Sequence, residues 1–205
     1  NWDGALDIRL VYDAICGEVP GAAIPGGAEG LPAGSTFTPA NLGAAINACF
    51  SPTPQGLQRM TQFLAVTKIP ANFIGTDLGY VTFAMSNLVH DPHKLAGKVG
   101  TGNEGVDYGD PAVDAAIARV APNPGAANRL GAFYTPTGDT RGARIVSLHT
   151  DKDGLVLVEN ESEYASRTDP AFFTAAVGVE ATPTHCGFTA AETWSAWGSL
   201  RAWRA

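Results

Sequence analysis

The sequence predicts a mixed α/β chain with a largely helical first part and a small parallel sheet near its C-terminal end. Residues 1–140 show helical periodicity broken by glycine-rich and proline-rich loops, without the period-2 alternation of strands. Residues 141–205 show the order strand, helix, strand, helix, which predicts two parallel strands joined by a right-handed crossover. We therefore expect two domains, 1–140 and 141–205.

The first part is expected to contain six helices. Thr38 followed by Pro39 predicts one helix start, because threonine caps a helix and proline suits its first turn. Gly75 and Gly79 lower the helix propensity of the fourth helix without removing its periodicity. The expected ranges are 5–16, 39–50, 54–67, 71–89, 111–120 and 124–133.

In the second part, the β-branched run 144–148 is typical of a buried parallel strand. Thr189 and Glu192 form a capping-box pattern, which predicts the start of the last helix. Trp194 and Trp197 recur there with helical spacing, and we interpret them as core residues. The expected strands are 143–149 and 172–179, and the expected helices are 159–167 and 189–203.

Two parallel strands do not form a stable sheet alone, because parallel sheets are normally buried on both faces and open edges pair with further strands. We therefore expect the missing strands to come from another chain or segment. The first residues, 1–4, resemble the middle of a longer sequence. We therefore expect that this chain arises by proteolytic processing or is a fragment.

Composition narrows the classes of partner. Hydrophobic residues make up 45% of the 205 residues and charged residues 16%, which suits a globular chain with a core. A net charge of −7 argues against a nucleic-acid partner, because phosphates attract basic surfaces. No apolar run reaches the roughly 18 residues of a membrane span.

Two candidate catalytic residues follow the predicted strands. Asp153 lies just past the end of strand 143–149, and His185 lies shortly before the last helix. Ligands bind at the carboxyl ends of strands in open α/β sheets, and a carboxylate can orient a histidine that acts as general base. The order matches the last two members of a nucleophile–acid–histidine triad, but the chain contains no G-x-S-x-G motif.

Several alternatives accompany this interpretation. Asp151 is a second candidate for the acid, and the segment 151–154 resembles a calcium loop without its later oxygen ligands. His90 and His93 form a pair with no third ligand in register, so we expect a surface loop there and no metal. His149 is expected to pack at the strand end, or else to support the site.

No cofactor motif is present in the sequence. The glycine-rich segment 97–102 resembles a phosphate loop but lacks the Gly-Lys-Ser/Thr ending and a preceding strand. We therefore expect no nucleotide, no metal and no other cofactor.

The three cysteines, Cys16, Cys49 and Cys186, are the disulfide candidates. An odd count leaves at least one cysteine free or paired outside the chain. Cys16 and Cys49 flank a loop rich in glycine and proline and either bridge each other or stay free. Cys186 would then be the cysteine left over.

The residues around the two candidates resemble a known family. The segment 148–156 reads LHTDKDGLV, and 185–192 reads HCGFTAAE before a final LRAW. Both resemble motifs of secreted or exported bacterial α/β-hydrolases of the esterase type. The opening residues 1–16 resemble the start of the cap in such enzymes, and Gly102 and Asn103 also look like family features. The resemblance covers most of the chain.

The resemblance implies the closing half of an α/β-hydrolase fold at 141–205, with a helical cap or lid at 1–140. It implies Asp153 as triad acid and His185 as triad base, with the nucleophilic serine on a separate N-terminal chain or segment. That chain would be the protein partner, and the substrate would be a small carboxylic ester held in an apolar pocket under the cap. The implied location is secreted or periplasmic.

Feruloyl esterases and tannases, which are similar here, join a cysteine beside the serine to one beside the histidine. This implies that Cys186 bonds to a cysteine of the missing part and makes a processed heterodimer; the alternative is a buried free thiol. Two other functions stay open: an amidase or peptidase of the same fold, and a non-catalytic subunit that binds a partner through its sheet edge.

Overall fold

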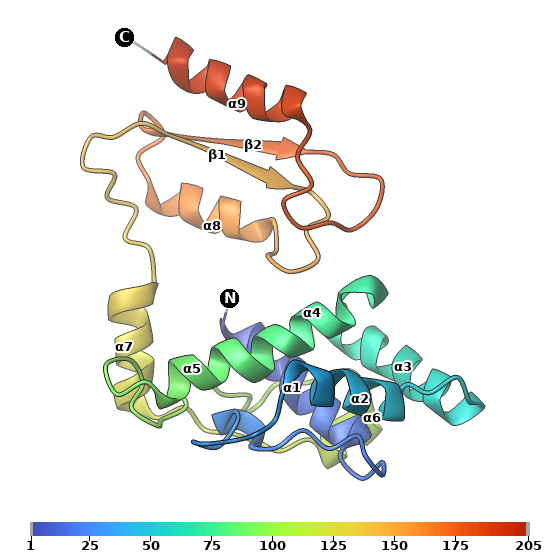
Figure 1. The fold of residues 1–205 in the computed structure, drawn as a ribbon. Coiled ribbons are helices and arrows are strands. Elements are labelled where there is room, and N and C mark those ends of the chain that lie inside the picture. Colours follow the sequence, from blue (N-terminus) through green and yellow to red (C-terminus); the bar gives the residue numbers. More distant parts are fainter. Residues whose placement is uncertain (1, 204–205) are drawn as a thin grey trace. The chain divides into compact units, whose positions relative to one another are not determined.

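A computed structural model describes residues 2–203, with side chains described from Gly4 onward. The chain has a mixed α/β fold, as the sequence predicts, and forms two compact units that divide between Tyr134 and Thr135. The first unit contains helices and loops, and the second contains the strands β1 and β2 with the helices α8 and α9 (Figure 1). Asn1, where the family resemblance begins, lies outside the described residues.

The helices of the first unit largely follow the predicted ranges. One helical path runs from Ile74 to His90, because a π-helical segment, Tyr80–Ala84, joins α4 to α5 without a break (Figure 1). The helix α6 ends earlier than predicted, because Ile117 has extended backbone angles. The elements are α1 Trp2–Cys16, α2 Pro39–Cys49, α3 Pro54–Thr67, α4 Ile74–Gly79, α5 Met85–His90, α6 Pro111–Ala116 and α7 Pro124–Tyr134.

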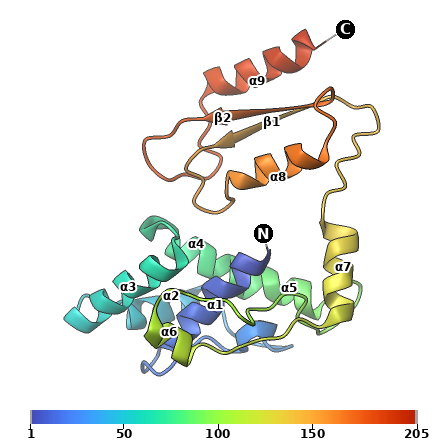
Figure 2. The same cartoon turned by 180° about the vertical axis from the view of Figure 1, so that it is seen from behind.

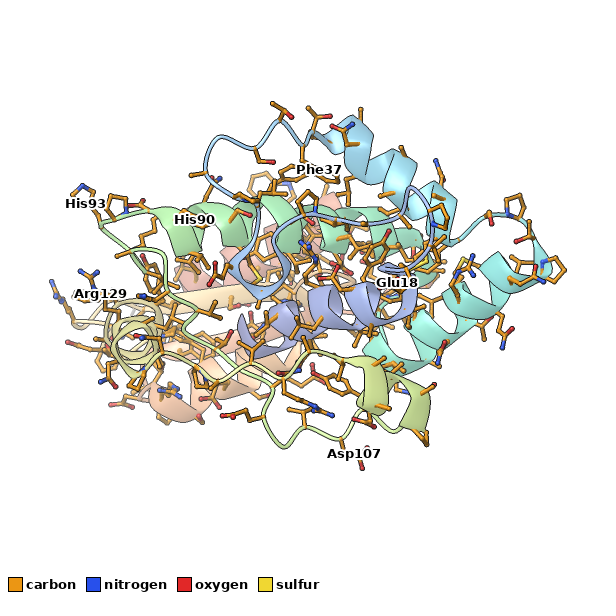
Figure 3. The ribbon with its side chains drawn as sticks, turned by 90° about the horizontal axis from the view of Figure 1, so that it is seen from below. Glu18, Phe37, His90, His93, Asp107 and Arg129 are labelled. Atoms are coloured by element: carbon orange, nitrogen blue, oxygen red, sulfur yellow. A yellow bond between two sulfur atoms is a disulfide. The ribbon has the colours of Figure 1, made fainter. Side chains whose placement is uncertain are left out.

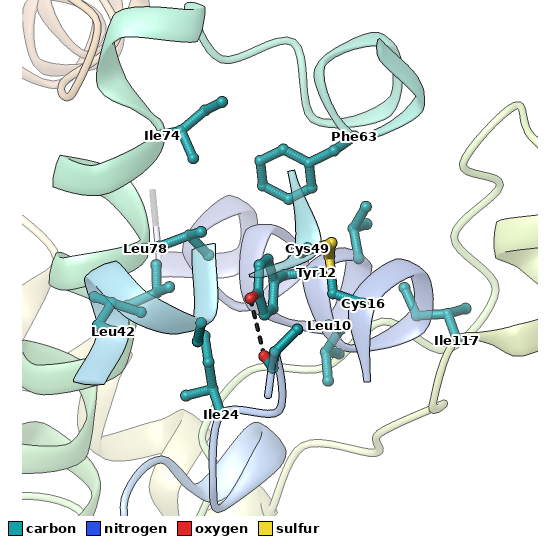
Figure 4. Packing of buried hydrophobic residues seen from close by; sticks show 14 of the residues in the cluster. Leu10, Tyr12, Cys16, Ile24, Leu42, Cys49, Phe63, Ile74, Leu78 and Ile117 are labelled. Carbon is teal, nitrogen blue, oxygen red and sulfur yellow. Dashed lines mark hydrogen bonds between the residues drawn. A yellow bond between two sulfur atoms is a disulfide. The ribbon is translucent and has the colours of Figure 1, made fainter. Parts of the chain in front are cut away.

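Tyr12, on α1, lies at the centre of the main core of the first unit. Its ring meets the rings of Phe50 and Phe63 edge-on, with centroid distances of 5.9 and 6.2 Å. Its hydroxyl donates a 2.9 Å hydrogen bond to the backbone oxygen of Ala22, drawn as a dashed line in Figure 4. A buried phenol therefore satisfies its polar end while packing three helices together.

Arg9, on α1, forms hydrogen bonds that hold the long loop after this helix in place. Its side chain is buried, and its Nε lies 3.0 Å from the carboxylate of Asp13. Its Nη2 donates to the backbone oxygens of Ile24 and Pro25, at 2.6 and 3.1 Å. These bonds give the buried guanidinium charge a partner and give the loop carbonyls a donor.

A disulfide joins Cys16, the last residue of α1, to Cys49, the last residue of α2. Both side chains are fully buried, and Figure 4 shows the bond beside Tyr12. The bond closes a loop across a sequence separation of 33 residues. It therefore limits the unfolded chain more than a short-range bond would.

The second unit contains a two-stranded parallel sheet between two helices. Strand β1, Ile145–Thr150, pairs in register with β2, Phe173–Gly178. The crossover helix α8, Glu159–Arg167, and the last helix α9, Ala190–Ala202, lie on opposite faces of the sheet, as Figures 1 and 2 show. The sequence predicts this order of strand, helix, strand and helix with parallel strands.

The two faces of the sheet contact different helices. On one face, Ser147 donates a 2.5 Å hydrogen bond to Glu161 of α8. On the other face, Gly178 lies under α9, and a Cβ there would come within 2.5 Å of a carboxylate oxygen of Glu192. A larger residue at this position would therefore displace the Glu192 side chain.

The second unit buries very little apolar surface. Phe173 is the one large apolar side chain that is buried among the described residues from Thr135 on. Trp194 and Trp197 are 71% and 51% exposed, so our interpretation of them as core residues is wrong for this unit. The less exposed positions of α9 are Glu192, Ala196 and Leu200, which follow one another at intervals of four residues, and Trp194 and Trp197 lie outside this line.

Among residues 2–203, the structure contains no helix that combines the length and apolar character needed to cross a bilayer.

We predict that replacing Cys16 and Cys49 together with alanine lowers the free energy of unfolding of the first unit by about 3–4 kcal/mol, because the unfolded chain regains its loop entropy. Urea unfolding followed by Tyr and Trp fluorescence measures this change. Cys186→Ser serves as the control and should leave the midpoint unchanged, because Cys186 is free within the chain. An unchanged midpoint in the double variant would contradict the prediction.

We also predict that amide hydrogen exchange is slower in the first unit than in the second. The first unit has an extended apolar core, whereas the second buries a single large apolar side chain in its described part. Exchange measured by mass spectrometry on peptides from 135–203 should require less opening energy than exchange in α1 and α4. Equal protection in the two units would contradict the prediction.

Candidate active site

A single bridge beyond the strand ends brings the two candidate residues together. Asp153 and Thr184 form an isolated parallel β-bridge past the last paired residues of β1 and β2. The backbone N–H of Gly154 donates to the oxygen of Thr184 at 2.9 Å, and the N–H of Thr184 donates to Lys152 at 3.1 Å. His185 follows Thr184 directly, so its backbone is held beside Asp153.

The imidazole of His185 faces the carboxylate of Asp153. Nδ1 of His185 lies 3.0 Å from Oδ1 and 2.9 Å from Oδ2. An ionised carboxylate only accepts hydrogen bonds, so in the neutral ring Nδ1 carries the proton and Nε2 carries the lone pair. The side chain of Asp153 is 5% exposed and that of His185 is 39% exposed. The acid is therefore enclosed while the base stays accessible.

The surroundings of Asp153 favour its charged form. Burial pushes the pKa of its carboxyl group upward, but the backbone N–H groups of Val156 and Leu155 and the ring of His185 outweigh burial and leave the pKa below its ordinary value. Both N–H groups donate to Oδ1 at 2.8 Å. The carboxylate therefore stays ionised and fixed in orientation at neutral pH.

Asp151, the alternative acid, has a different position. Its N–H donates to the oxygen of Gly178, and its Oδ1 accepts a 2.8 Å bond from the N–H of Glu180. Lys152 donates from Nζ to the backbone oxygen of Glu180 as well, at 2.6 Å. These bonds connect the end of β1 to the segment after β2. The carboxylate that binds His185 is that of Asp153 and not that of Asp151.

The turn after His185 presents a thiol beside the same imidazole. Cys186 has a left-handed backbone with φ +56°, and its Sγ lies 3.8 Å from Nε2 of His185. A Cβ at Gly187 would lie 2.7 Å from Oγ1 of Thr184, so the turn requires glycine there. Cys186 is exposed and free within the chain, so our alternative of a buried thiol is wrong.

The capping box predicted at the start of α9 is present. The hydroxyl of Thr189 accepts from the N–H of Glu192 at 3.2 Å, and the Glu192 side chain accepts from the N–H of Thr189 at 2.8 Å. This box fixes the end of the loop that carries His185.

None of the other histidines is bonded to Asp153 or His185 within the described residues. Nδ1 of His149 lies 2.9 Å from the backbone oxygen of Thr150, which fits a packing role at the strand end. His90 is the last residue of α5 and His93 is exposed on the following turn (Figure 3). No cluster of three or more metal-ligating residues of the His, Cys, Asp and Glu types occurs within the described chain.

The glycine-rich segment 97–102 has structural reasons for its glycines. A Cβ at Gly100 would lie 2.6 Å from the side chain of Leu130, and one at Gly102 would lie 2.4 Å from the backbone oxygen of Val120. Both glycines therefore allow close packing of the chain.

Asn103 organises the loop that follows this segment. Its side chain is fully buried and donates from Nδ2 to Tyr108 and to the oxygen of Ala118, at 3.0 and 2.9 Å. Its Oδ1 accepts from the N–H of Val120 at 2.7 Å. The sequence marks Asn103 only through the family resemblance, and these partners lie too far along the chain to be predicted.

A separate groove of about 620 Å³ lies in the first unit, between α1, the end of α3 and the loop 106–110. Its acidic side chains already have partners, since Asp7 accepts a 2.6 Å bond from Tyr108 and Asp110 caps α6. Burial, together with Asp7, raises the pKa of Tyr108 to about 12. The sequence did not indicate this groove, because three distant segments form its walls.

Comparison of the chain with protein-family models, with curated proteins and with solved structures finds no match.

We predict that the Asp153 carboxyl titrates below the ordinary aspartate pKa of about 3.9. Its interactions stabilise the fold fully above that pH, and this contribution is lost as the pH falls through the lower value of the folded chain. Carbon-13 NMR of the carboxyl group measures the midpoint directly. A midpoint at or above the ordinary value would contradict the prediction.

Proposed function

We propose that this chain supplies the acid and the base of a serine hydrolase of the α/β-hydrolase fold that cleaves carboxylic esters. The observation that carries the proposal is the hydrogen bond between His185 Nδ1 and the enclosed Asp153 carboxylate at the ends of parallel strands. Histidine oriented in this way takes a proton at Nε2 and is stabilised as imidazolium by the carboxylate. The order of acid, histidine and final helix supports the same fold.

In this proposal the nucleophilic serine belongs to a chain or segment outside these residues, because the sequence contains no G-x-S-x-G. That part would add strands to the sheet and supply backbone N–H groups for the oxyanion. The open sheet and the exposed tryptophans of the second unit support the need for such a partner. His185 would accept the serine proton and return it to the leaving alcohol.

A non-catalytic binding subunit is the second candidate function. The exposure of Trp194 and Trp197 favours it, because exposed aromatic side chains often mark contact surfaces. An amidase or peptidase would use the same Asp153 and His185, and only the substrate distinguishes it from an esterase.

The proposed location is secreted or periplasmic. The disulfide between Cys16 and Cys49 supports this location, because disulfides persist mainly in oxidising compartments.

We predict that His185→Ala lowers ester turnover by at least about 10³-fold in the protein assembled with its serine-bearing partner, because the serine loses its base. Asp153→Asn should lower turnover by about 10²–10⁴-fold, because the imidazole loses its orienting charge. Hydrolysis of a short-chain aryl ester measures both effects.

His93→Ala is the matched control, since His93 is an exposed histidine of the first unit. It should keep full turnover. Full turnover in His185→Ala would remove this histidine from the reaction and leave the binding subunit as the better interpretation.

Mass spectrometry with and without reductant identifies the partner, whose sequence should contain G-x-S-x-G.

A further inference from the structure

The loop that carries His185 depends on hydrogen bonds for its shape. Of the described residues 179–187, none is buried, and Val179 is 82% exposed. A segment without apolar burial is held by its polar contacts and opens easily when these are lost. The position of the His185 imidazole therefore depends on the groups that bond this loop to the rest of the second unit.

Lys152 bonds this loop at both ends of a bend at residues 181–182. At the start of the bend, its Nζ donates to the backbone oxygen of Glu180 at 2.6 Å and, more weakly, to that of Ala181 at 3.5 Å. After the bend, its backbone oxygen accepts the N–H of Thr184 at 3.1 Å. One residue therefore holds the bend from both sides.

We propose that Lys152 is a positioning residue for His185, because its ammonium group holds the bend that leads the chain to the bridge between Thr184 and Asp153. This inference rests on the proposed function, in which His185 is the base. It deepens that function, since Lys152 acts through the loop and not on the substrate.

The chemistry of lysine suits this role. Its ammonium group has three N–H donors at the end of a flexible side chain and no acceptor. Consecutive carbonyl groups of an extended chain point in opposite directions, so one ammonium group reaches two of them only where the chain bends. A charged donor forms a stronger hydrogen bond than a neutral one, although exposure to water reduces the gain.

Asp151 adds a second anchor to the same loop. Its N–H donates to the backbone oxygen of Gly178 at 2.9 Å, and its Oδ1 accepts the N–H of Glu180 at 2.8 Å. Glu180 is therefore bonded through its N–H to Asp151 and through its oxygen to Lys152. The consecutive residues 151–153 hold the loop at its start, at its bend and at its histidine.

Loss of the Lys152 ammonium group should leave the fold intact and loosen the histidine. The oxygens of Glu180 and Ala181 can then bond to water, because both bonds lie at the surface. The effect falls on geometry, and a displacement of about 1 Å at a reacting group can cost about 100-fold in rate. We expect about a tenfold loss, because the bonds made by Asp151 and Thr184 remain.

The test compares Lys152→Met, which removes the ammonium group, with Lys152→Arg, which keeps N–H donors. Exchange of the His185 Nδ1 proton with water is measured in the full chain by ¹⁵N NMR. It should be about tenfold faster in Lys152→Met and within about twofold of wild type in Lys152→Arg. Lys98→Met, at an exposed lysine of the first unit, is the control and should match wild type.

Turnover of a short-chain aryl ester by the protein assembled with its serine-bearing partner is the second readout. The kcat should fall about tenfold in Lys152→Met with little change in KM, because the substrate still binds while the base is misplaced. Lys152→Arg should restore kcat to within about twofold of wild type, and Lys98→Met should leave it unchanged.

Wild-type exchange in Lys152→Met would overturn the proposal. An arginine variant that exchanges as fast as the methionine variant would overturn it too, because the role requires donors at this position. The urea unfolding midpoint is measured for each variant. A large drop in the midpoint of Lys152→Met would show that Lys152 stabilises the whole unit, which also contradicts a positioning role.

The two readouts separate this inference from the proposed function. The exchange rate needs no partner, so it tests the positioning of His185 directly. Turnover that does not depend on His185 would refute the esterase and leave the exchange result standing. Turnover that requires His185, together with wild-type exchange in Lys152→Met, would refute the positioning role and leave the esterase standing.

Discussion

The hydrogen bond between His185 and Asp153 holds the two candidate catalytic side chains together. It depends on a backbone contact between the loops that carry them. The parallel bridge between Asp153 and Thr184 joins two loops that are 31 residues apart in sequence, beyond the paired strands. Two N–H groups then fix the carboxylate, and the carboxylate fixes the imidazole. Each partner is thereby held before any ligand arrives, which is how proteins avoid reorganisation at a reacting centre.

The two units differ in how they obtain stability. The first has an apolar core around Tyr12, an ion pair between the buried Arg9 and the partly exposed Asp13, and a buried disulfide. The second has good local structure, including the capping box of α9, but buries one large apolar side chain among its described residues. Local hydrogen bonds define its shape without supplying much free energy, since exposed apolar side chains contribute little to burial.

The sequence predicts the elements well wherever a local signal marks their ends. The helices after Thr38 and Thr53 begin at prolines, and α8 has the predicted range 159–167. The sequence does not predict the end of α6, where Ile117 has an extended backbone and its side chain is buried in the core of the first unit. No local sequence pattern indicates the π-helical segment in the path from Ile74 to His90.

For the candidate site, the sequence predicts the strand ends and the order of acid and histidine, because both are local patterns. The resemblance of the segment 148–156 favours Asp153 over Asp151. The structure brings Asp153 to His185 through its pairing with Thr184, a long-range contact that no local pattern encodes. The position of Cys186 rests on a left-handed backbone in a residue other than glycine, which composition does not indicate.

The most direct measurement is a long-range ¹H–¹⁵N NMR spectrum of the His185 ring in the full chain. For the neutral imidazole, we expect a proton on Nδ1, slowed in exchange by Asp153, and an unprotonated Nε2. Asp153→Asn should weaken this preference. A neutral ring protonated at Nε2, or one that averages freely between both forms, would contradict the pairing on which the proposed chemistry depends.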